Sequence, residues 1–243
     1  MELPKSKLPA ETQDPRNLII FSKVKQGKSS ALAELPNNLM LDTEGGLAYI
    51  EALKVRVTSV KDIKEVCQEV IKAGKPYDFI TIDTVTALED IVKPLALHLY
   101  KQTPAGEKFT GTDVIDAAMG AGYKFMRDAL EQVINMVAKC TRNVILVCHA
   151  KDAAIANSDL TAKQIDLLGK TGRILASKSD AIGYLYRDDE SNTILSFNTN
   201  DKFVECGARP AHLRNKDIVL GKYQEDGTVV YDWTQIYPSL RNA

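Results

Sequence analysis

The segment Asn17-Leu18-Ile19-Ile20-Phe21-Ser22-Lys23-Val24-Lys25-Gln26-Gly27-Lys28-Ser29-Ser30 decides the fold of this 243-residue chain. Residues 17–21 form an apolar run of strand length, and residues 28–34 have the pattern of a helix. A short polar loop ending in Gly27-Lys28-Ser29 joins the two. A strand, a loop and a helix in this order predict the first unit of an α/β fold.

The joining loop matches the phosphate-binding pattern G-x-x-x-x-G-K-[ST], except that Ser22 stands in place of the first glycine. In that pattern the loop amides and the lysine bind phosphates, and the hydroxyl after the lysine binds Mg²⁺. Glycine tolerates backbone conformations that are costly for other residues, so we expect Ser22 to weaken the phosphate grip. The predicted cradle is Ser22, Lys23, Val24, Lys25, Gln26, Gly27, Lys28, Ser29 and Ser30.

Two other interpretations of this loop stay open. An ordinary strand-to-helix turn with solvated lysines would have the same hydropathy pattern. Lys23 also stands where the deviant loops of partition-type ATPases carry an extra lysine. That version normally has two glycines next, and Val24 and Lys25 stand there instead.

Composition limits the remaining possibilities. A 44% hydrophobic content suits one substantial core, and a net charge of −1 gives no global positive field that would attract nucleic acid or acidic membranes. The four cysteines form no C-x-x-C pair, which favours reduced thiols over disulfides or zinc. Because no membrane-length apolar run or signal peptide is visible, we expect a cytoplasmic protein, in the host cytoplasm if a phage encodes it.

Alternating apolar runs and amphipathic segments predict a mostly parallel sheet flanked by helices, followed by an antiparallel β extension at the C-terminus. Pro94 predicts a kink or break in one helix. The expected domains are a flexible arm (1–16), an α/β core (17–213) and a C-terminal β-hairpin (214–243) of the same domain. The expected strands are 17–21, 38–42, 77–83, 142–149, 180–187, 193–197, 217–224 and 228–233, the helices are 28–34, 59–73, 85–100 and 116–139, and the irregular segments are 101–115 and 150–170.

Polar residues at three strand ends supply candidate chemistry, because ligands of open α/β sheets bind at the carboxyl ends of the strands. Asp83 follows Phe79-Ile80-Thr81-Ile82 and is a candidate Mg²⁺ ligand together with Ser29. Glu44 follows the run 38–42 and is a candidate general base. His149 ends the run 142–149 and could sense a terminal phosphate. The alternatives are that Asp83 only caps the following helix, that Glu44 only belongs to a turn, and that His149 has a structural role.

Taken together, the loop, L-M-L-D-T-E-G-G (39–46), F-I-T-I-D-T-V-T-A-L (79–88) and V-I-L-V-C-H-A-K-D (144–152) resemble the core of RecA-like ATPases. The resemblance covers about residues 17–213 and is closest to phage-type ATP-binding proteins counted as minimal RecA-like recombinases. It implies ATP and Mg²⁺ as cofactors, with Lys28 on the phosphates, Asp83 as the Walker B residue, Glu44 as the catalytic glutamate and His149 as the nucleotide sensor.

The same resemblance implies partners. RecA-like proteins form rings or filaments in which a neighbouring copy inserts a basic residue towards the γ-phosphate, and the candidates here are Lys202 and Arg209. Segments 101–122 and 150–172 would face single-stranded DNA, and a single-strand-binding protein is a further expected partner. The expected function is therefore ATP hydrolysis by an oligomer acting on single-stranded DNA in recombination or strand annealing. A degenerate nucleotide-binding scaffold without hydrolysis is the rival interpretation.

Overall fold

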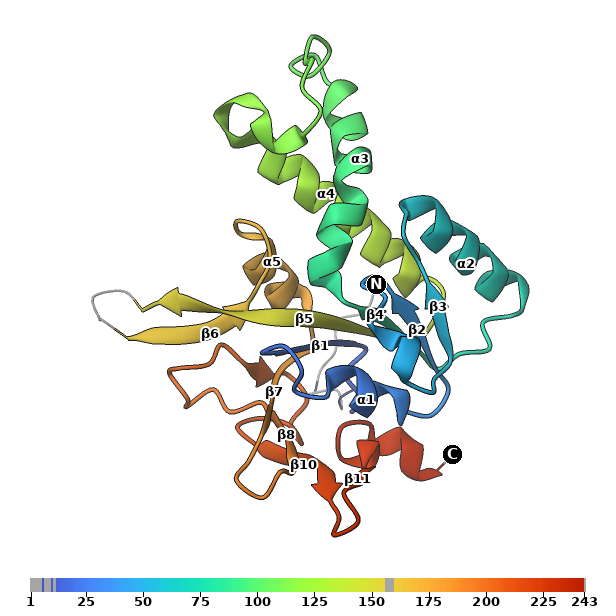
Figure 1. Cartoon of the computed structure of the whole chain (residues 1–243), viewed down its shortest axis with the longest axis vertical. Helices are drawn as coiled ribbons and strands as arrows, with labels where there is room; N and C mark the ends of the chain where they lie inside the picture. Colours follow the sequence, from blue (N-terminus) through green and yellow to red (C-terminus); the bar gives the residue numbers. More distant parts are fainter. Residues whose placement is uncertain (1–5, 7–9, 11, 156–159, 243) are drawn as a thin grey trace.

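One mixed β-sheet forms the centre of the protein, whose computed structural model describes residues 6, 10, 12–155 and 160–242 (Figure 1). The strand order is β11-β10-β8-β7-β1-β5-β4-β2-β3, with β6 paired to β5 and β9 paired to β7. The strands are β1 (Asn17–Ser22), β2 (Asn38–Asp42), β3 (Lys54–Arg56), β4 (Phe79–Asp83), β5 (Asn143–Ala154), β6 (Thr161–Ile165), β7 (Ala181–Arg187), β8 (Thr193–Ser196), β9 (Gly207–Ala208), β10 (Asp217–Tyr223) and β11 (Val229–Tyr231). The helices are α1 (Lys28–Ala33), α2 (Val60–Lys72), α3 (Val85–Lys101), α4 (Ala121–Ala138) and α5 (Thr171–Lys178), and the 3-10 helices are η1 (Gly46–Tyr49), η2 (Val114–Asp116), η3 (Ala118–Gly120), η4 (Trp233–Gln235) and η5 (Pro238–Asn242).

The predicted mostly parallel sheet is confirmed. Strands β3, β2, β4, β5, β1 and β7 pair in parallel, whereas β8, β10 and β11 continue the sheet antiparallel. Parallel strands that are covered on both faces need apolar side chains on both faces, which is why the sequences of these strands are apolar runs. Strand β5 separates β1 from β4, so the ends of three neighbouring strands meet at one edge.

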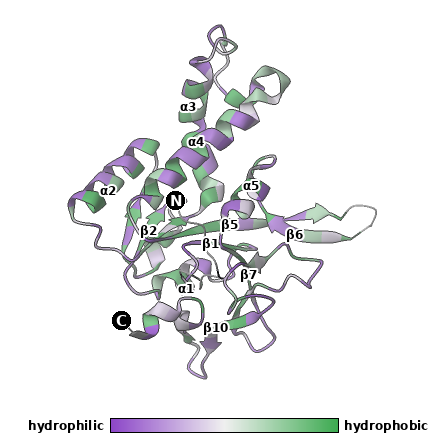
Figure 2. Cartoon of the chain, turned by 180° about the vertical axis from the view of Figure 1, so that it is seen from behind, coloured by the Kyte–Doolittle hydropathy of each residue, from purple (hydrophilic) through white to green (hydrophobic). Residues whose placement is uncertain are grey.

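Two apolar clusters cover the two faces of the sheet. Along β1, Ile19 and Phe21 face the cluster formed with α2, α3 and α4, whereas Leu18 and Ile20 face the cluster formed with α1 and the C-terminal segment. This alternation is the period of two expected of a strand. Figure 2 shows the central strands coloured as hydrophobic, with hydrophilic and hydrophobic residues alternating along α2.

The C-terminal segment is part of the second cluster. The predicted hairpin forms as β10 and β11, at the antiparallel edge of the sheet. Beyond it, Trp233 and Tyr237 are buried, and the indole Nε1 of Trp233 donates a hydrogen bond to the carbonyl of Ala31 in α1 at 2.9 Å. The ring of Tyr237 packs edge-on against Phe79 of β4, with centroids 4.7 Å apart. The last residues therefore support the helix that follows the Gly27-Lys28-Ser29 loop.

Helix α3 continues through Pro94 to Lys101, so the predicted break does not occur, and the alternative of a kink stays a prediction. The predicted start of the following helix was wrong. Helix α4 begins at Ala121 and not at residue 116, because Met119 and Gly120 have φ angles of 58° and 71°. This left-handed backbone interrupts the helical path.

Segment 150–170 is also more regular than expected. Strand β5 runs on to Ala154 and pairs antiparallel with β6, which forms a hairpin extending away from the main sheet (Figure 1). Residues 156–159 lie outside the described part of the chain. Most of the predicted flexible arm 1–16 lies outside it as well, but the backbone N–H of Arg16 donates to Asp180 at 3.0 Å, so the end of the arm is fixed. Within the described residues, no helix combines the length and apolar character needed to cross a membrane.

Candidate nucleotide-binding site

The candidate site lies at the carboxyl ends of β1, β2, β4 and β5. In the sheet register Ser22 pairs with His149, and Asp42 pairs with Asp83. Strands β2 and β4 therefore end level with each other, β1 ends two residues further along, and β5 continues past His149. The loops that follow β1, β2 and β4 start at the same edge of the sheet. The structure thus brings together Ser22, Lys28, Ser29, Glu44, Asp83 and His149, which the sequence singled out separately.

The loop after β1 has its unusual backbone at two positions other than Ser22. Lys25 and Gly27 have φ angles of 60° and 89°, whereas Ser22 has no positive φ and is fully buried at the end of the strand. Serine is therefore accommodated without the left-handed strain that would require glycine. The backbone at Ser22 therefore gives no reason for a weaker phosphate grip, and the expected weakening stays a prediction.

Ser22 instead contacts the lysine of the motif. The ammonium of Lys28 donates to Ser22 Oγ at 2.8 Å and to the carbonyl of Lys23 at 3.3 Å. Lys28 is buried, and this burial lowers its pKa, while the negative charges of Asp83 and Glu44 act in the opposite direction. The ammonium of Lys28 is thus held against the loop that would bind a phosphate. The side chains of Lys23, Val24, Lys25 and Ser30 are exposed around it.

Ser29 and Asp83 lie close enough to share one cation. The hydroxyl of Ser29 donates to Asp83 Oδ2 at 2.6 Å, across the gap between α1 and β4. Burial raises the pKa of Asp83, the nearby Glu44 adds to that rise, and the Ser29 hydrogen bond opposes it. One hydroxyl and one carboxylate fit Mg²⁺, which takes few protein oxygens and completes its shell with water and phosphate. The described residues contain no cluster of three or more acidic, histidine or cysteine ligands.

Among the described residues, one carboxylate oxygen of Glu44 is hydrogen-bonded and the other is not. Its Oε1 accepts hydrogen bonds from Thr84 Oγ1 at 2.6 Å and from His149 Nε2 at 2.8 Å. Within the described residues no hydrogen bond reaches the second oxygen, Oε2, and the side chain is 38% exposed. A carboxylate oriented through one oxygen can accept a proton through the other, as a general base requires.

The turn that carries Glu44 depends on Asp42. Its carboxylate accepts hydrogen bonds from the backbone N–H of Gly45 at 2.6 Å and of Leu47 at 3.3 Å, and it lies 3.5 Å from Arg56 Nη1. The guanidinium of Arg56 also donates to the Asp42 carbonyl at 2.8 Å. The sequence did not identify Arg56, because only the pairing of β3 with β2 brings it to this turn.

His149 is connected to the β5–β6 hairpin through Thr86, which the sequence also did not identify. The Thr86 hydroxyl accepts a hydrogen bond from the backbone N–H of His149 at 3.0 Å and donates to the carbonyl of Asp166 at 3.2 Å. Asp166 in turn donates its backbone N–H to the His149 carbonyl at 2.8 Å. His149 Nδ1 is buried and has no hydrogen-bond partner among the described residues. The Thr86 hydroxyl thus links His149 to Asp166, the residue that follows β6.

The two candidate trans-acting residues lie away from this edge. Arg209 lies at the opposite end of the strands, where its backbone N–H bonds the carbonyl of Asp180 and its guanidinium is 3.8 Å from the Asp180 carboxylate. Lys202 is exposed on the loop between β8 and β9, with its ammonium 5.4 Å from the ring centroid of Phe203. Neither belongs to the site of its own subunit.

The sheet order, the phosphate-type loop and the carboxylates at the strand ends define a RecA-like P-loop NTPase. The chain belongs to the family described as "AAA domain", whose match covers residues 14–212. No curated protein matches the chain. Among solved structures, one similar fold is described as "Crystal structure of the RadB recombinase", with 13% identity, a TM-score of 0.47, and coverage of 88% of this chain and 90% of that chain.

Proposed function

We propose that the protein is a Mg²⁺-dependent ATPase that assembles with copies of itself and acts on single-stranded DNA in recombination or strand annealing. The observation that carries the proposal is the meeting of Lys28, the Ser29–Asp83 pair and Glu44 at one sheet edge. Lys28 and the loop amides would bind the β- and γ-phosphates, and Ser29 and Asp83 would hold Mg²⁺, which neutralises charge on the phosphates when bound. Glu44 Oε2 would take the proton of the attacking water.

Hydrolysis is tested with two variants at this edge. Glu44→Gln should bind ATP as the natural protein does and lose about 10²- to 10⁴-fold in hydrolysis, the usual contribution of a general base. Lys28→Ala should lose binding, because it removes the buried ammonium. Phosphate release is measured with and without single-stranded DNA. If the natural protein releases no more phosphate than Lys28→Ala under either condition, the non-hydrolysing scaffold is the better interpretation.

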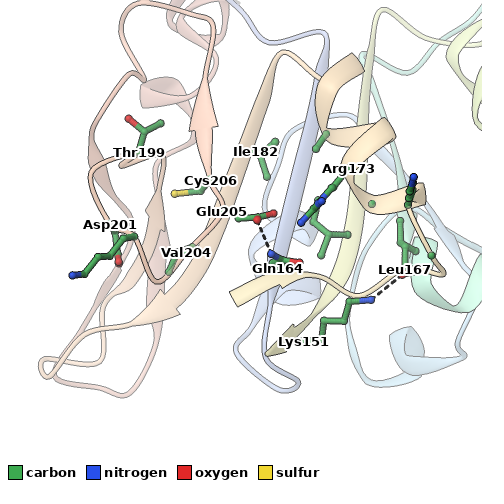
Figure 3. A pocket seen from close by; sticks show the side chains of 16 residues that line it. Lys151, Gln164, Leu167, Arg173, Ile182, Thr199, Asp201, Val204, Glu205 and Cys206 are labelled. Carbon is green, nitrogen blue, oxygen red and sulfur yellow. Dashed lines mark hydrogen bonds between the residues drawn. The ribbon is translucent and has the colours of Figure 1, made fainter. Parts of the chain in front are cut away.

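The surface beside the β5–β6 hairpin supports DNA as the partner. A cavity of about 620 Å³ lies between β6, α5 and the loop that follows β8, and its lining includes Lys170, Arg173 and Lys202 (Figure 3). Of the basic residues between 150 and 178, Lys151, Lys163 and Lys178 are paired with acidic residues. Lys170 and Arg173 have no ion pair within the described residues, so their charge is available to a phosphate backbone.

Salt dependence distinguishes this DNA contact from a structural role. Arg173→Ala should weaken binding of a fluorescent thymidine oligonucleotide at every salt concentration. It should also reduce the slope of log K against log salt by about 1, the value for one phosphate contact. Lys64→Ala, which removes an exposed lysine of α2, is the matched control and should leave the slope unchanged. An unchanged slope for Arg173→Ala would remove Arg173 from the proposed DNA surface.

Assembly is tested by complementation between two inactive variants. Lys202→Ala retains its own site but would provide no trans-acting lysine, whereas Glu44→Gln lacks the base but still provides the lysine. If Lys202 acts in the neighbouring site, a mixture of the two should hydrolyse ATP faster than the sum of the separate proteins. We favour Lys202 over Arg209, since Arg209 is already occupied by Asp180 and by the carbonyl of Ser177. A mixture with only additive activity rejects Lys202.

A further inference from the structure

Strand β7 brings an arginine to the loop from the side opposite the carboxylates. β1 lies between β5 and β7, and Asp83, Glu44 and His149 all belong to the β5 side. On the other side, Tyr184 of β7 pairs with Phe21 of β1, and β7 continues for three more residues to Arg187. β1 ends one residue after Phe21, so Arg187 lies level with the loop that follows β1.

Arg187 packs directly on the loop glycine. A Cβ atom built on Gly27 would lie 3.3 Å from Arg187 Nη2 and 4.0 Å from the hydroxyl of Tyr231. Tyr231 is itself fixed against β10, because a Cβ on Gly221 would come within 2.6 Å of the tyrosine ring. The absence of a side chain at both glycines therefore lets a guanidinium and a phenol stand beside the residue that precedes Lys28.

The charge of Arg187 is not used within the fold. Within the described residues Arg187 makes no ion pair, and its one hydrogen bond is a long one, from Nη1 to the carbonyl of Ser191 at 3.4 Å. The carboxylate of the next residue, Asp188, is instead bonded by the N–H groups of Glu190 and Asn192. An arginine presents five N–H donors in a planar fork that fits two phosphate oxygens. A free guanidinium beside a phosphate-type loop therefore has an anion as its natural ligand.

We propose that Arg187, positioned next to Tyr231, binds the α-phosphate and ribose end of the nucleotide in its own subunit. This inference rests on the proposed ATP site and specifies the residues that line it on the β7 side. The hydrolysable end of the nucleotide points towards Asp83 and Glu44 on the β5 side, so the other end extends towards β7. Arg187 then contacts a part that ATP and ADP share, and it has no part in cleaving the γ-phosphate.

Calorimetric binding of ATP and ADP, each with Mg²⁺, tests this assignment. Arg187→Ala should weaken both nucleotides by the same factor, about tenfold, as expected for one charge-assisted contact. The affinity of Arg187→Lys for each nucleotide should lie between those of Arg187→Ala and the natural protein, because lysine keeps the charge but not the planar fork. Lys222→Ala removes an exposed cation from the neighbouring β10 and should bind as the natural protein does. Equal affinity of Arg187→Ala and the natural protein, or a loss confined to ATP, would overturn the assignment.

Failure of this inference and failure of the proposed function give different results. If the natural protein binds ATP and Lys28→Ala does not, the proposed ATP site is supported. An unchanged affinity in Arg187→Ala then rejects only the role of Arg187. If neither the natural protein nor Lys28→Ala binds nucleotide, both proposals fall. Arg187 is exposed, so its replacement should leave the fold intact, and a circular dichroism spectrum equal to that of Lys222→Ala verifies this.

Discussion

Replacing Ser22 by alanine should destabilise the nucleotide-free protein and at the same time tighten its binding of ATP. Ser22 Oγ is the nearer of the two acceptors of the buried Lys28 ammonium, at 2.8 Å against 3.3 Å for the Lys23 carbonyl. A hydrogen bond to a charged group contributes about 1.5–3 kcal/mol, and because the second acceptor remains, we expect the lower end of this range. For a domain of this size the melting temperature should fall by roughly 3–6 °C.

The gain in affinity follows from the same contact. In the nucleotide complex, phosphate oxygens would replace Ser22 as the partner of Lys28, so the bound state loses little when the serine is removed. A difference of about 1.4 kcal/mol between the two states corresponds to tenfold tighter binding. Thermal unfolding without nucleotide and calorimetric titration with ATP measure the two effects. Ser30→Ala, at an exposed position of α1, is the control for stability and should melt as the natural protein does. An unchanged melting temperature, or weaker binding, in Ser22→Ala would refute the reasoning.

Three further variants test other parts of the structure. Burial raises the pKa of Asp83 above its ordinary 3.8, so its charged form destabilises the folded state at high pH and this penalty disappears as the pH falls. Asp83→Asn should therefore raise the melting temperature of the nucleotide-free protein more at about pH 8 than at about pH 4, near the unfolded pKa, and an equal rise at both would contradict this. Trp233→Ala should lower the free energy of unfolding in urea by about 3–5 kcal/mol, and a loss below about 1 kcal/mol would exclude the C-terminal segment from the core. Thr86→Val should keep ATP hydrolysis without DNA and lose its stimulation by DNA, whereas Thr86→Ser should retain both; stimulation that persists in Thr86→Val would reject the link from His149 to the hairpin.

Short-range patterns were enough to predict the parallel core. The apolar runs of β1, β2, β4 and β5 are continuous because both faces of these strands are buried, and each run stops at the polar residue that faces the site. The positions of Glu44, Asp83 and His149 follow from this rule, since each stands at or just after the end of an apolar run. Helix α2 was equally predictable, because Ser59 and Asp62 form a capping box at its start.

Features that depend on which strands are neighbours could not be predicted from the sequence. Among the described residues of the β5–β6 hairpin beyond His149, only Ala162 and Ile165 are buried, and Lys151 and Lys163 occupy positions where an apolar run would have indicated a strand. The sequence does not mark Arg187 as a site residue, because only the pairing of β7 with β1 brings it to the loop after β1. The backbone of the loop could not be predicted either, because the motif assigns glycine to the position of Ser22, whereas the left-handed backbone falls at Lys25 and Gly27.

The length of β5 has a mechanical consequence. The strand is paired with β1 up to His149, and the five residues beyond it, to Ala154, pair with β6, while the ammonium of Lys151 also donates to the carbonyl of Leu167 at 2.8 Å. At about 3.3 Å per residue this portion extends roughly 17 Å. A rotation of about 10° about His149 would move the far end by about 3 Å, a displacement comparable to the rise of one residue along a strand.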